Sequence, residues 1–240
     1  MNRTALVTGA NQGLGLALTK ALAQRLAPDD TVFLASRSEA RGEAARRSLG
    51  QTNAQVRVIH LDVTEVASIK ALADHKKSAH GSIDFVASNA AARISKDQPQ
   101  AEQGRDFIAT NNHGSRNLFG ALKPLLNANA RYVMVASSFS QLRRLPENLH
   151  SLFETDCLGL DEIEASMDRY VNLTEAGKAK GEGWPNWINI PSKIGQIATA
   201  RVAANLCKPL GDRCPCIVRS RFQNGRWLFS ARLFSPLCDQ

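Results

Sequence analysis

With 240 residues, 43% of them hydrophobic and 22% charged, the chain is long enough for one domain with a buried core and is not disordered by composition. No apolar run approaches the roughly 18 residues that cross a bilayer, and the N-terminus leaves no room for a signal peptide, so we expect a cytoplasmic protein without a membrane partner. Most of the net charge of +8 falls in residues 201–240, and a basic tail alone does not indicate a nucleic-acid partner.

Strand and helix patterns alternate along the first half of the chain. Buried strands are predicted at 3–8, 31–35, 55–61, 83–87 and 131–136. Helical spacing follows at 14–26, in the stretch that ends near 49, from 66 to 72 and onward, and at 103–126, in one or two pieces. This alternation indicates βαβ units and a parallel sheet that is covered on both faces.

The middle of the chain departs from this pattern. Residues 141–183 are polar and rich in acids, which predicts helical excursions that form a lid or a pocket rim. Helical spacing returns at 189–206, with Pro191 near the first turn, where its missing N–H costs nothing. We therefore predict one doubly wound α/β domain over residues 1–212 and a divergent tail over 213–240, either disordered or an edge strand.

A glycine-rich turn, TGANQGLG, joins the first predicted strand to the first helix. Gly9 permits the tight turn, while Gly13 and Gly15 let the backbone approach a diphosphate at the helix N-terminus. Glycines alone are weak evidence, because many loops need them. Their place between a strand and a helix predicts a dinucleotide site.

Two arginines follow the second strand, where an acidic residue normally meets the ribose 2′-hydroxyl of NAD(H). Arg37 and Arg41 suit a 2′-phosphate, since guanidinium groups bind phosphate bidentately, so we expect NADP(H). The alternative is two solvated arginines at a helix start. Asp62 is a candidate for the adenine amine or, alternatively, a helix N-cap.

Seven segments resemble the short-chain dehydrogenase/reductase family in order and spacing, and most of all its NADPH-dependent carbonyl reductase branch. They are TGANQGLG, ASRSEARGEAA, LDVTEVASIKAL, VASNAA, TNNHGSRNL, VMVASS and GWPNWINIPSKIG. The likeness covers about residues 3–206 and includes a helical insertion before the last of these segments. It implies a Rossmann-like fold that binds NADP(H) and reduces a carbonyl compound.

The resemblance also assigns roles residue by residue. It gives Ser138 the hydrogen bond to the substrate carbonyl, Asn111 a water in a proton relay, and Lys193 the nicotinamide ribose and the tuning of a neighbouring acid. Taken alone, Ser138 is also compatible with a strand cap, and Asn111 with a bond to backbone in a kinked helix. Cofactor contacts carry over to Gly9, Asn11, Gln12, Gly13, Leu14, Gly15, Arg37, Arg41, Asp62, Val63, Asn89, Ala90 and Lys193.

One position departs from the family. A tyrosine is expected four residues before Lys193, one helical turn away, and Asn189 stands there. An amide donates hydrogen bonds but does not give up a proton near neutral pH. Losing a positioned general acid typically costs about 10²–10⁴ in rate. We therefore expect slow catalysis, with water or Lys193 giving the proton, or a non-catalytic NADP(H)-binding sensor or regulatory protein.

The end of the chain is the second departure. The segment CPCIVRS is only a faint echo of the family, and residues 222–240 have no recognised counterpart in it, as in a frameshifted or truncated gene or a genuinely divergent one. Five cysteines without a signal peptide fit a reducing compartment. Cys214 and Cys216 are too close together for a zinc pair, so we expect no metal.

Aromatic residues near the last helix are candidates for the substrate pocket. Phe139, Trp184 and Trp187 would form an apolar wall for a bulky carbonyl compound, while core packing explains the tryptophans equally well. His113 is a weak candidate acid, because a lone helical histidine more often serves packing or the surface. By analogy with carbonyl reductases, whose insertion covers a face that many relatives pair through, we expect a monomer.

Overall fold

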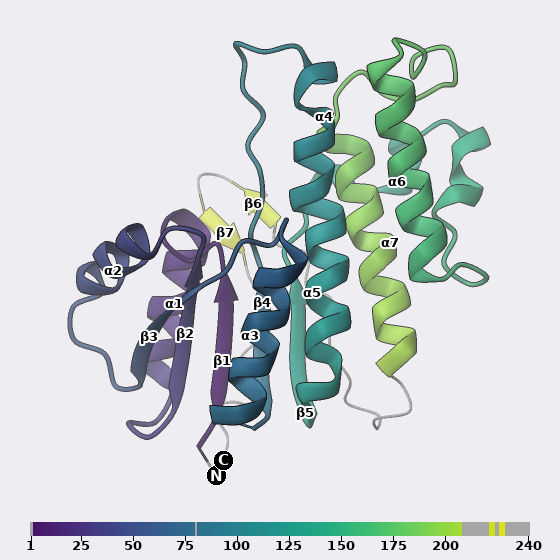
Figure 1. Ribbon diagram of the computed structural model, residues 1–240. Helices are drawn as coiled ribbons and strands as arrows, with labels where there is room; N and C mark the ends of the chain where they lie inside the picture. Colours follow the sequence, from purple (N-terminus) through teal and green to yellow (C-terminus); the bar gives the residue numbers. More distant parts are fainter. Residues whose placement is uncertain (1, 80, 208–220, 224–225, 229–240) are drawn as a thin grey trace.

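The computed structural model describes residues 2–79, 81–207, 221–223 and 226–228 (Figure 1). Its centre is a five-stranded parallel sheet in the order β3-β2-β1-β4-β5. The strands are β1 (Thr4–Thr8), β2 (Thr31–Ser36), β3 (Gln55–His60), β4 (Ile83–Ser88) and β5 (Leu126–Met134). Strand order reverses between β1 and β4, which makes this a doubly wound, Rossmann-like sheet and confirms the predicted fold class.

Helices connect these strands and extend beyond the sheet. They are α1 (Gly13–Arg25), α2 (Glu39–Ser48), α3 (Val66–Ala79), α4 (Gln100–Ile108), α5 (Gly114–Leu122), α6 (Leu160–Glu175) and α7 (Asn189–Cys207). Shorter turns are η1 (Ala109–His113), η2 (Lys123–Leu125), η3 (Ser138–Ser140), η4 (Leu142–Arg144) and η5 (Glu147–Leu152). None of the helices in the described part of the chain is long and apolar enough to cross a bilayer.

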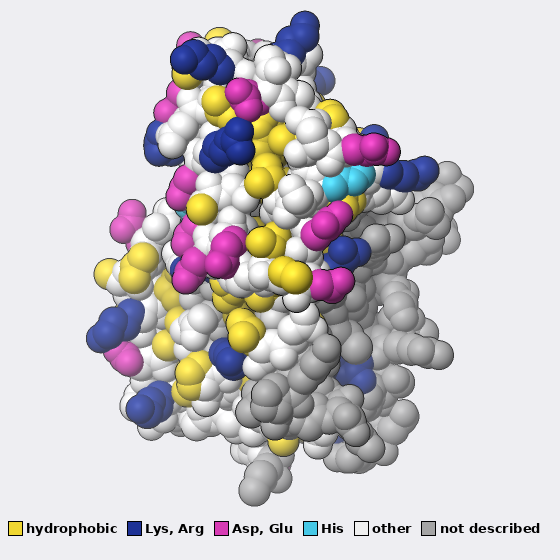
Figure 2. Space-filling view, turned by 90° about the vertical axis from the view of Figure 1, so that its right-hand side faces the viewer, with side chains coloured by type: hydrophobic (Ala, Val, Ile, Leu, Met, Phe, Trp, Pro, Cys, Tyr) yellow, Lys and Arg dark blue, Asp and Glu magenta, His cyan; other side chains and the backbone are white. Residues whose placement is uncertain are grey.

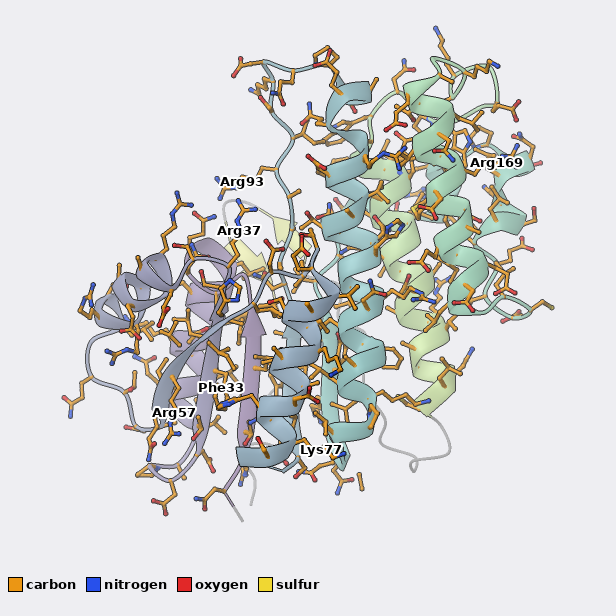
Figure 3. The ribbon with its side chains drawn as sticks, in the orientation of Figure 1. Phe33, Arg37, Arg57, Lys77, Arg93 and Arg169 are labelled. Carbon is orange, nitrogen blue, oxygen red and sulfur yellow. The ribbon has the colours of Figure 1, made fainter. Side chains whose placement is uncertain are left out.

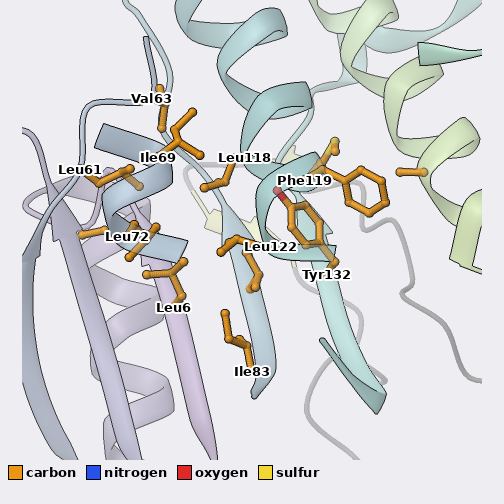
Figure 4. Packing of buried hydrophobic residues seen from close by; sticks show 14 of the residues in the cluster. Leu6, Leu61, Val63, Ile69, Leu72, Ile83, Leu118, Phe119, Leu122 and Tyr132 are labelled. Carbon is orange, nitrogen blue, oxygen red and sulfur yellow. The ribbon is translucent and has the colours of Figure 1, made fainter. Parts of the chain in front are cut away.

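Successive side chains along each strand point to opposite faces of the sheet and pack into two separate hydrophobic cores. On β1, Leu6 packs with α3, α5 and α7, whereas Ala5 and Val7 pack with α1 and α2. The first core is shown in Figure 4, where leucines from α3 and α5 meet Tyr132 of β5. Both faces of the sheet are therefore buried, as parallel sheets require.

The insertion at 141–183 builds a third core outside the sheet. Helix α6 lies against α4 and α7 (Figure 1), and Met167 and Tyr170 pack there with Ile194 and Trp184. Ion pairs join α6 to the helices beneath it, from Arg105 to Glu175 at 2.6 Å and from Arg116 to Asp161 and Glu164, and His113 Nε2 lies 3.2 Å from a carboxylate oxygen of Asp168. Figure 2 shows this face, on which acidic and basic side chains are interspersed.

Strand β5 begins earlier than the predicted 131–136. The helix predicted at 103–126 consists of two α-helices, α4 and α5, which η1 joins. Strand β5 already starts at Leu126, which pairs with Ile83. Asp84 explains the extension, because its carboxylate accepts from Asn127 Nδ2 at 2.5 Å and from the Thr4 amide at 2.7 Å. This tertiary contact draws polar residues into a strand that local propensity does not indicate.

The predicted tail of residues 213–240 lies mostly outside the described residues, as do Cys214, Cys216 and Cys238. Two short strands in it, β6 (Arg221–Gln223) and β7 (Arg226–Leu228), pair with each other in an antiparallel sheet of their own. They do not extend the five-stranded sheet.

The carboxyl ends of β1 and β4 are joined by one buried hydroxyl. Thr8 Oγ1 accepts from the amides of Asn89 and Ala90, both at 2.9 Å, and donates to the Ala87 carbonyl at 3.4 Å. Thr8 is fully buried, so no water can replace it. This hydroxyl fixes the ends of β1 and β4, the two strands between which the strand order of the sheet reverses.

We predict that Thr8→Val lowers the free energy of unfolding by about 2–4 kcal/mol, because two half-buried N–H groups lose their acceptor and the buried hydroxyl loses its bonds. Thr19→Val is the matched control: Thr19 is equally buried, but its hydroxyl only donates to the Gly15 carbonyl one turn back in α1. That variant should cost less than about 1 kcal/mol. Urea unfolding of both variants measures the difference, and equal losses would contradict this role of Thr8.

Candidate cofactor cleft and catalytic residues

A cleft of about 560 Å³ opens at the carboxyl ends of β1, β2 and β4. All the predicted cofactor residues line it except Gly15 and Lys193. The lining residues are Gly9, Asn11, Gln12, Gly13, Leu14, Ser36, Arg37, Ser38, Arg41, Leu61, Asp62, Val63, Asn89, Ala90, Ala91, Ala92, Arg93 and Thr110. The topological switch of the sheet therefore coincides with a large polar opening, as in open α/β folds that bind nucleotides.

The glycine turn is shaped for close approach. A Cβ on Gly15 would stand 2.4 Å from the Gly9 carbonyl oxygen, so only glycine lets α1 start this close to β1. Gly13, at φ 54°, faces open space on the cleft side. Gln12 provides no side-chain cap, and the first amides of α1 are left to face the cleft. Such a helix start attracts phosphate through free N–H groups and the helix dipole.

Two serines set the turn after β2. Ser36 Oγ accepts from the Ser38 amide at 3.2 Å, and Ser38 Oγ caps α2 by accepting from the Arg41 amide at 3.4 Å. Arg37 and Arg41 consequently lie on one rim of the cleft, where Figure 3 shows Arg37. Neither guanidinium forms a hydrogen bond or ion pair with the residues that the structure describes.

Arg93 was not foreseen from the sequence. It follows β4, and its side chain points toward the same opening as Arg37 (Figure 3). The cleft therefore carries three guanidinium groups against the single carboxylate of Asp62. No local pattern distinguishes Arg93 from other exposed arginines; only the position of its loop above the sheet places it there.

Asp62 is held by a turn rather than left free. Its Oδ1 accepts from the amide and hydroxyl of Thr64, at 3.0 and 2.7 Å. Burial raises the pKa of Asp62, but the Thr64 hydrogen bonds and the nearby Arg37 and His60 outweigh burial and lower it overall. The carboxylate stays charged, and no described residue bonds to its second oxygen.

Asn89 braces the glycine turn. Its Nδ2 donates to the Thr8 carbonyl at 3.0 Å and to the Gly9 carbonyl at 3.4 Å. The side chain thus holds the floor of the cleft in place, between the ends of β1 and β4.

Asn189 and Lys193 lie one turn apart at the start of α7, both half-buried. The turn η3 packs against α7 and carries Ser138, which is exposed. Burial lowers the pKa of Lys193 to about 8, and no charged side chain contributes to this shift. The predicted residues Ser138, Asn189 and Lys193 are thereby gathered around one end of a helix.

Asn111 sits in the π-helical turn η1, between α4 and α5. It is fully buried, and its Oδ1 accepts from the Ala92 amide at 2.8 Å. Its main-chain carbonyl accepts from Gln196 Nε2 of α7 at 2.6 Å. Gln196, which sequence reasoning did not single out, also accepts from Lys193 Nζ at 2.6 Å. The predicted water-holding residue is therefore tied directly to α7.

The aromatic candidates separate in the structure. Trp184 is 2% exposed and packs with Tyr170 and Phe153 in the third core, which favours the packing interpretation. Trp187 is 37% exposed, with its ring 4.5 Å from that of Phe139. Phe139 and Trp187 thus form a partly exposed aromatic pair beside η3. His113 pairs with Asp168 on the outer side of the helices.

Comparison with known proteins agrees with this geometry. The sequence model described as short chain dehydrogenase matches residues 3–148. The chain belongs to this family. It is 33% identical to carbonyl reductase (NADPH) 1 of Mus musculus over 83% of the chain and 73% of that protein, and 34% identical to that of Oryctolagus cuniculus over 84% and 74%. Menthone neomenthol reductase from Mentha piperita has a similar structure, with TM-score 0.73, 26% identity, and coverage of 87% and 86%.

The short-chain dehydrogenase cleft fits the dinucleotide that the sequence predicts. Uncapped amides of α1 face the place of a diphosphate, Gly13 leaves space there, and the guanidinium groups face the opening without partners among the described residues. A cavity of about 560 Å³ is in the range of ligand sites. In the described part of this short-chain dehydrogenase, no cluster of three His, Cys, Asp or Glu side chains is arranged to hold a metal.

The lowered pKa of the half-buried Lys193 predicts a pH dependence of stability. Between its folded pKa of about 8 and its ordinary 10.5, the unfolded chain binds a proton that the folded chain does not, so stability rises with pH across this window. Lys193→Met removes this titration, so its stability relative to the wild type should fall as the pH rises from 8 toward 10. Urea unfolding at several pH values tests this.

The control is Lys70→Met, because the Lys70 side chain is exposed in a surface pair with Asp74. Its difference from the wild type should not follow the same pH window. A constant difference between Lys193→Met and the wild type from pH 7 to pH 10 would contradict the lowered pKa.

Proposed function

We propose that the protein is an NADPH-dependent reductase of ketones, aldehydes or quinones, with weakened proton donation. The observation that carries the proposal is the cleft at the switch of the sheet, lined by the glycine turn and by Arg37 and Arg41. The likeness to carbonyl reductases supports it, since these relatives are named for NADPH and for carbonyl reduction.

The preference for NADPH rests on charge. No carboxylate ends β2, where an acid would favour the ribose hydroxyl of NADH, and the residues there are Ser36 and Arg37. Arg37 and Arg41 supply donors that match a phosphate in number and geometry. The Asp62 carboxylate is then available for the adenine amine through its second oxygen.

The catalytic proposal assigns each residue a task. When bound, a nicotinamide cofactor supplies the hydride that reduces a carbonyl carbon. Ser138, exposed on η3, donates a hydrogen bond to the carbonyl oxygen and polarises it. Lys193, with a pKa near 8, holds the nicotinamide ribose and supplies a protonated amine at this helix end. Asn189 orients the substrate without giving up a proton.

A second candidate function rests on the same residue. Asn189 removes the ordinary acid, while Lys193 is bonded inward to Gln196. These two features favour a protein that binds NADP(H) without turning over substrate, such as a sensor or a regulatory protein. Oxidation of NADPH with a panel of quinones, diketones and aldehydes distinguishes the two. No rate above buffer, with NADPH bound, would favour the sensor.

We predict that Arg37→Asp weakens NADPH binding by about tenfold to a hundredfold and NADH binding much less, because a charge-assisted pair with the 2′-phosphate is lost. Fluorescence titration with each cofactor measures this. The control is Arg47→Asp, on α2 and away from the cleft, which should change neither affinity strongly. Equal losses for both cofactors would mean that Arg37 contacts a group that NADH and NADPH share, and no loss for either would mean that Arg37 faces solvent.

We predict that Asn189→Tyr raises kcat by roughly 10²-fold, since a positioned general acid contributes about 10²–10⁴. The measurement is NADPH oxidation under saturating cofactor, beside Asn186→Tyr as a surface control near the same helix. An unchanged rate together with intact NADPH binding would show that the geometry around Ser138 and Lys193 no longer supports the reaction.

Three further expectations remain predictions. The protein is expected in the cytoplasm, as a monomer, and without nucleic-acid or membrane partners. The third core supports the monomer, because α6 covers the outer side of α4 and α7. We also propose that residues 1–212 form the reductase domain and residues 213–240 a divergent tail. Sedimentation tests the oligomeric state directly.

A further inference from the structure

The side-chain amide of Gln196 joins Lys193 to Asn111, the residue to which the family resemblance assigns a water in a proton relay. Gln196 is 2% exposed and lies one turn after Lys193 on α7. Its Oε1 accepts from Lys193 Nζ at 2.6 Å, and its Nε2 donates to the Asn111 carbonyl at 2.6 Å and lies 3.3 Å from Ser115 Oγ. The polar groups of the side chain are all engaged, which makes this amide a fixed link.

The Asn111 carbonyl is available because of the π-turn. In η1 the Gly114 amide donates to the Ala109 carbonyl, five residues back. The regular α-helical pattern, in which each amide bonds to the carbonyl four residues back, is therefore interrupted at this point. The carbonyl of Asn111 then accepts from Ser115 Oγ at 2.8 Å and from Gln196 Nε2 at 2.6 Å. A carbonyl oxygen has two lone pairs, and both are occupied, which leaves no place for a water.

The surroundings of this link are closed and rigid. Asn111 Nδ2 donates to Ser192 Oγ at 3.4 Å, and Ser192 Oγ donates to Asn112 Oδ1 at 2.7 Å. Asn111, Asn112, Ser192 and Gln196 are each at most 4% exposed. A buried network whose members are satisfied holds one geometry, because breaking any bond leaves a buried group unpaired.

We propose that Gln196 is a positioning residue, which ties the Lys193 ammonium to the Asn111 carbonyl and closes the inner side of the proton path. The inference rests on the proposed reductase function and deepens it. An amide accepts at oxygen and donates at nitrogen, but it neither gains nor loses a proton near neutral pH. A proton therefore cannot pass from Asn111 through Gln196 to Lys193.

The proton balance of the reduction shows the consequence. Once the carbonyl carbon has taken a hydride, its oxygen must take one proton, and Lys193 can give it only if its neutral amine is recharged afterwards. Gln196 blocks recharging from the buried side. The proton that recharges Lys193 must therefore come from water in the cleft. Asn189 cannot give a proton to the substrate, and Gln196 cannot pass one to Lys193 from the buried side.

No charged side chain on the described neighbouring elements substitutes for this link. On the elements packed against α7, His113 of η1 pairs with Asp168 of α6, and Arg116 of α5 pairs with Asp161 and Glu164 of α6. Tyr132 of β5 is buried, with its pKa raised by burial. None of these groups contributes to the pKa shift of Lys193.

The first test measures Lys193 itself, without turnover. The pH dependence of its reaction with an amine-acylating reagent, followed by peptide mass spectrometry, gives its pKa. Gln196→Met removes the acceptor of the ammonium and should lower this pKa by about one further unit, since a hydrogen bond to the charged form favours that form. Thr199→Val, buried on the same helix and with no hydrogen bond to Lys193, should leave it unchanged.

Gln196→Glu is a second variant, which keeps the test decisive if Gln196→Met does not fold. A carboxylate at the same place should raise the pKa of Lys193, because an opposite charge favours the ammonium. If the folded Gln196 variants all share the wild-type pKa of Lys193, the positioning role is overturned. Opposite shifts in the two variants support it.

The second test restores a route for protons between Asn111 and Lys193 in the Asn189→Tyr variant, in which we expect faster turnover. Gln196→Ala leaves room for a water between Lys193 and the Asn111 carbonyl, so Asn189→Tyr/Gln196→Ala should turn over about tenfold faster than Asn189→Tyr alone, part of the 10²–10⁴ of general acid catalysis. Equal rates overturn the closed path. If neither variant oxidises NADPH, the proposed reductase function fails, while the pKa of Lys193 still decides the positioning role.

Discussion

The cleft exists because the buried hydroxyl of Thr8 holds the carboxyl ends of β1 and β4 together. Thr8 Oγ1 accepts two amides from the start of the loop after β4, and Asn89 in turn grips the carbonyls of the glycine turn. Close approach at Gly15 then seats α1 against the same turn. The amides of α1 and the guanidinium groups of the rim are therefore aimed from a rigid floor, which lets weak individual contacts act together on one ligand.

Sequence patterns predict the fold and the cleft well, because both depend on local signals. Periodicity places the five strands, and the glycine turn with Arg37 and Arg41 marks the cleft. The features that the patterns miss depend on contacts between distant residues. The early start of β5 needs Asp84, the place of Arg93 needs the loop above the sheet, and the role of Gln196 needs a carbonyl 85 residues away.

Asn189 and Gln196 of α7 acquire a joint meaning in the structure. Asn189 alone indicates a lost acid, which the sequence shows by its spacing from Lys193. Gln196 adds that the lysine is anchored inward, on a carbonyl that the π-turn exposes. If the two proposals hold, the cleft keeps its residues for the cofactor while the supply of protons to Lys193 is restricted, and the remaining rate of turnover then decides between a slow reductase and a sensor.

The strand order also bears on synthesis of the protein at the ribosome. Strand β1 is paired on one side by β2, but its other neighbour, β4, begins only at Ile83, and the Asp84 carboxylate then ties β1 to both β4 and β5. A nascent chain that has released only β1 to β3 holds half of the cleft, with the inner edge of β1 unpaired. The cleft therefore stays incomplete until β4 has left the exit tunnel and has paired with β1, and such long-range pairing is slow.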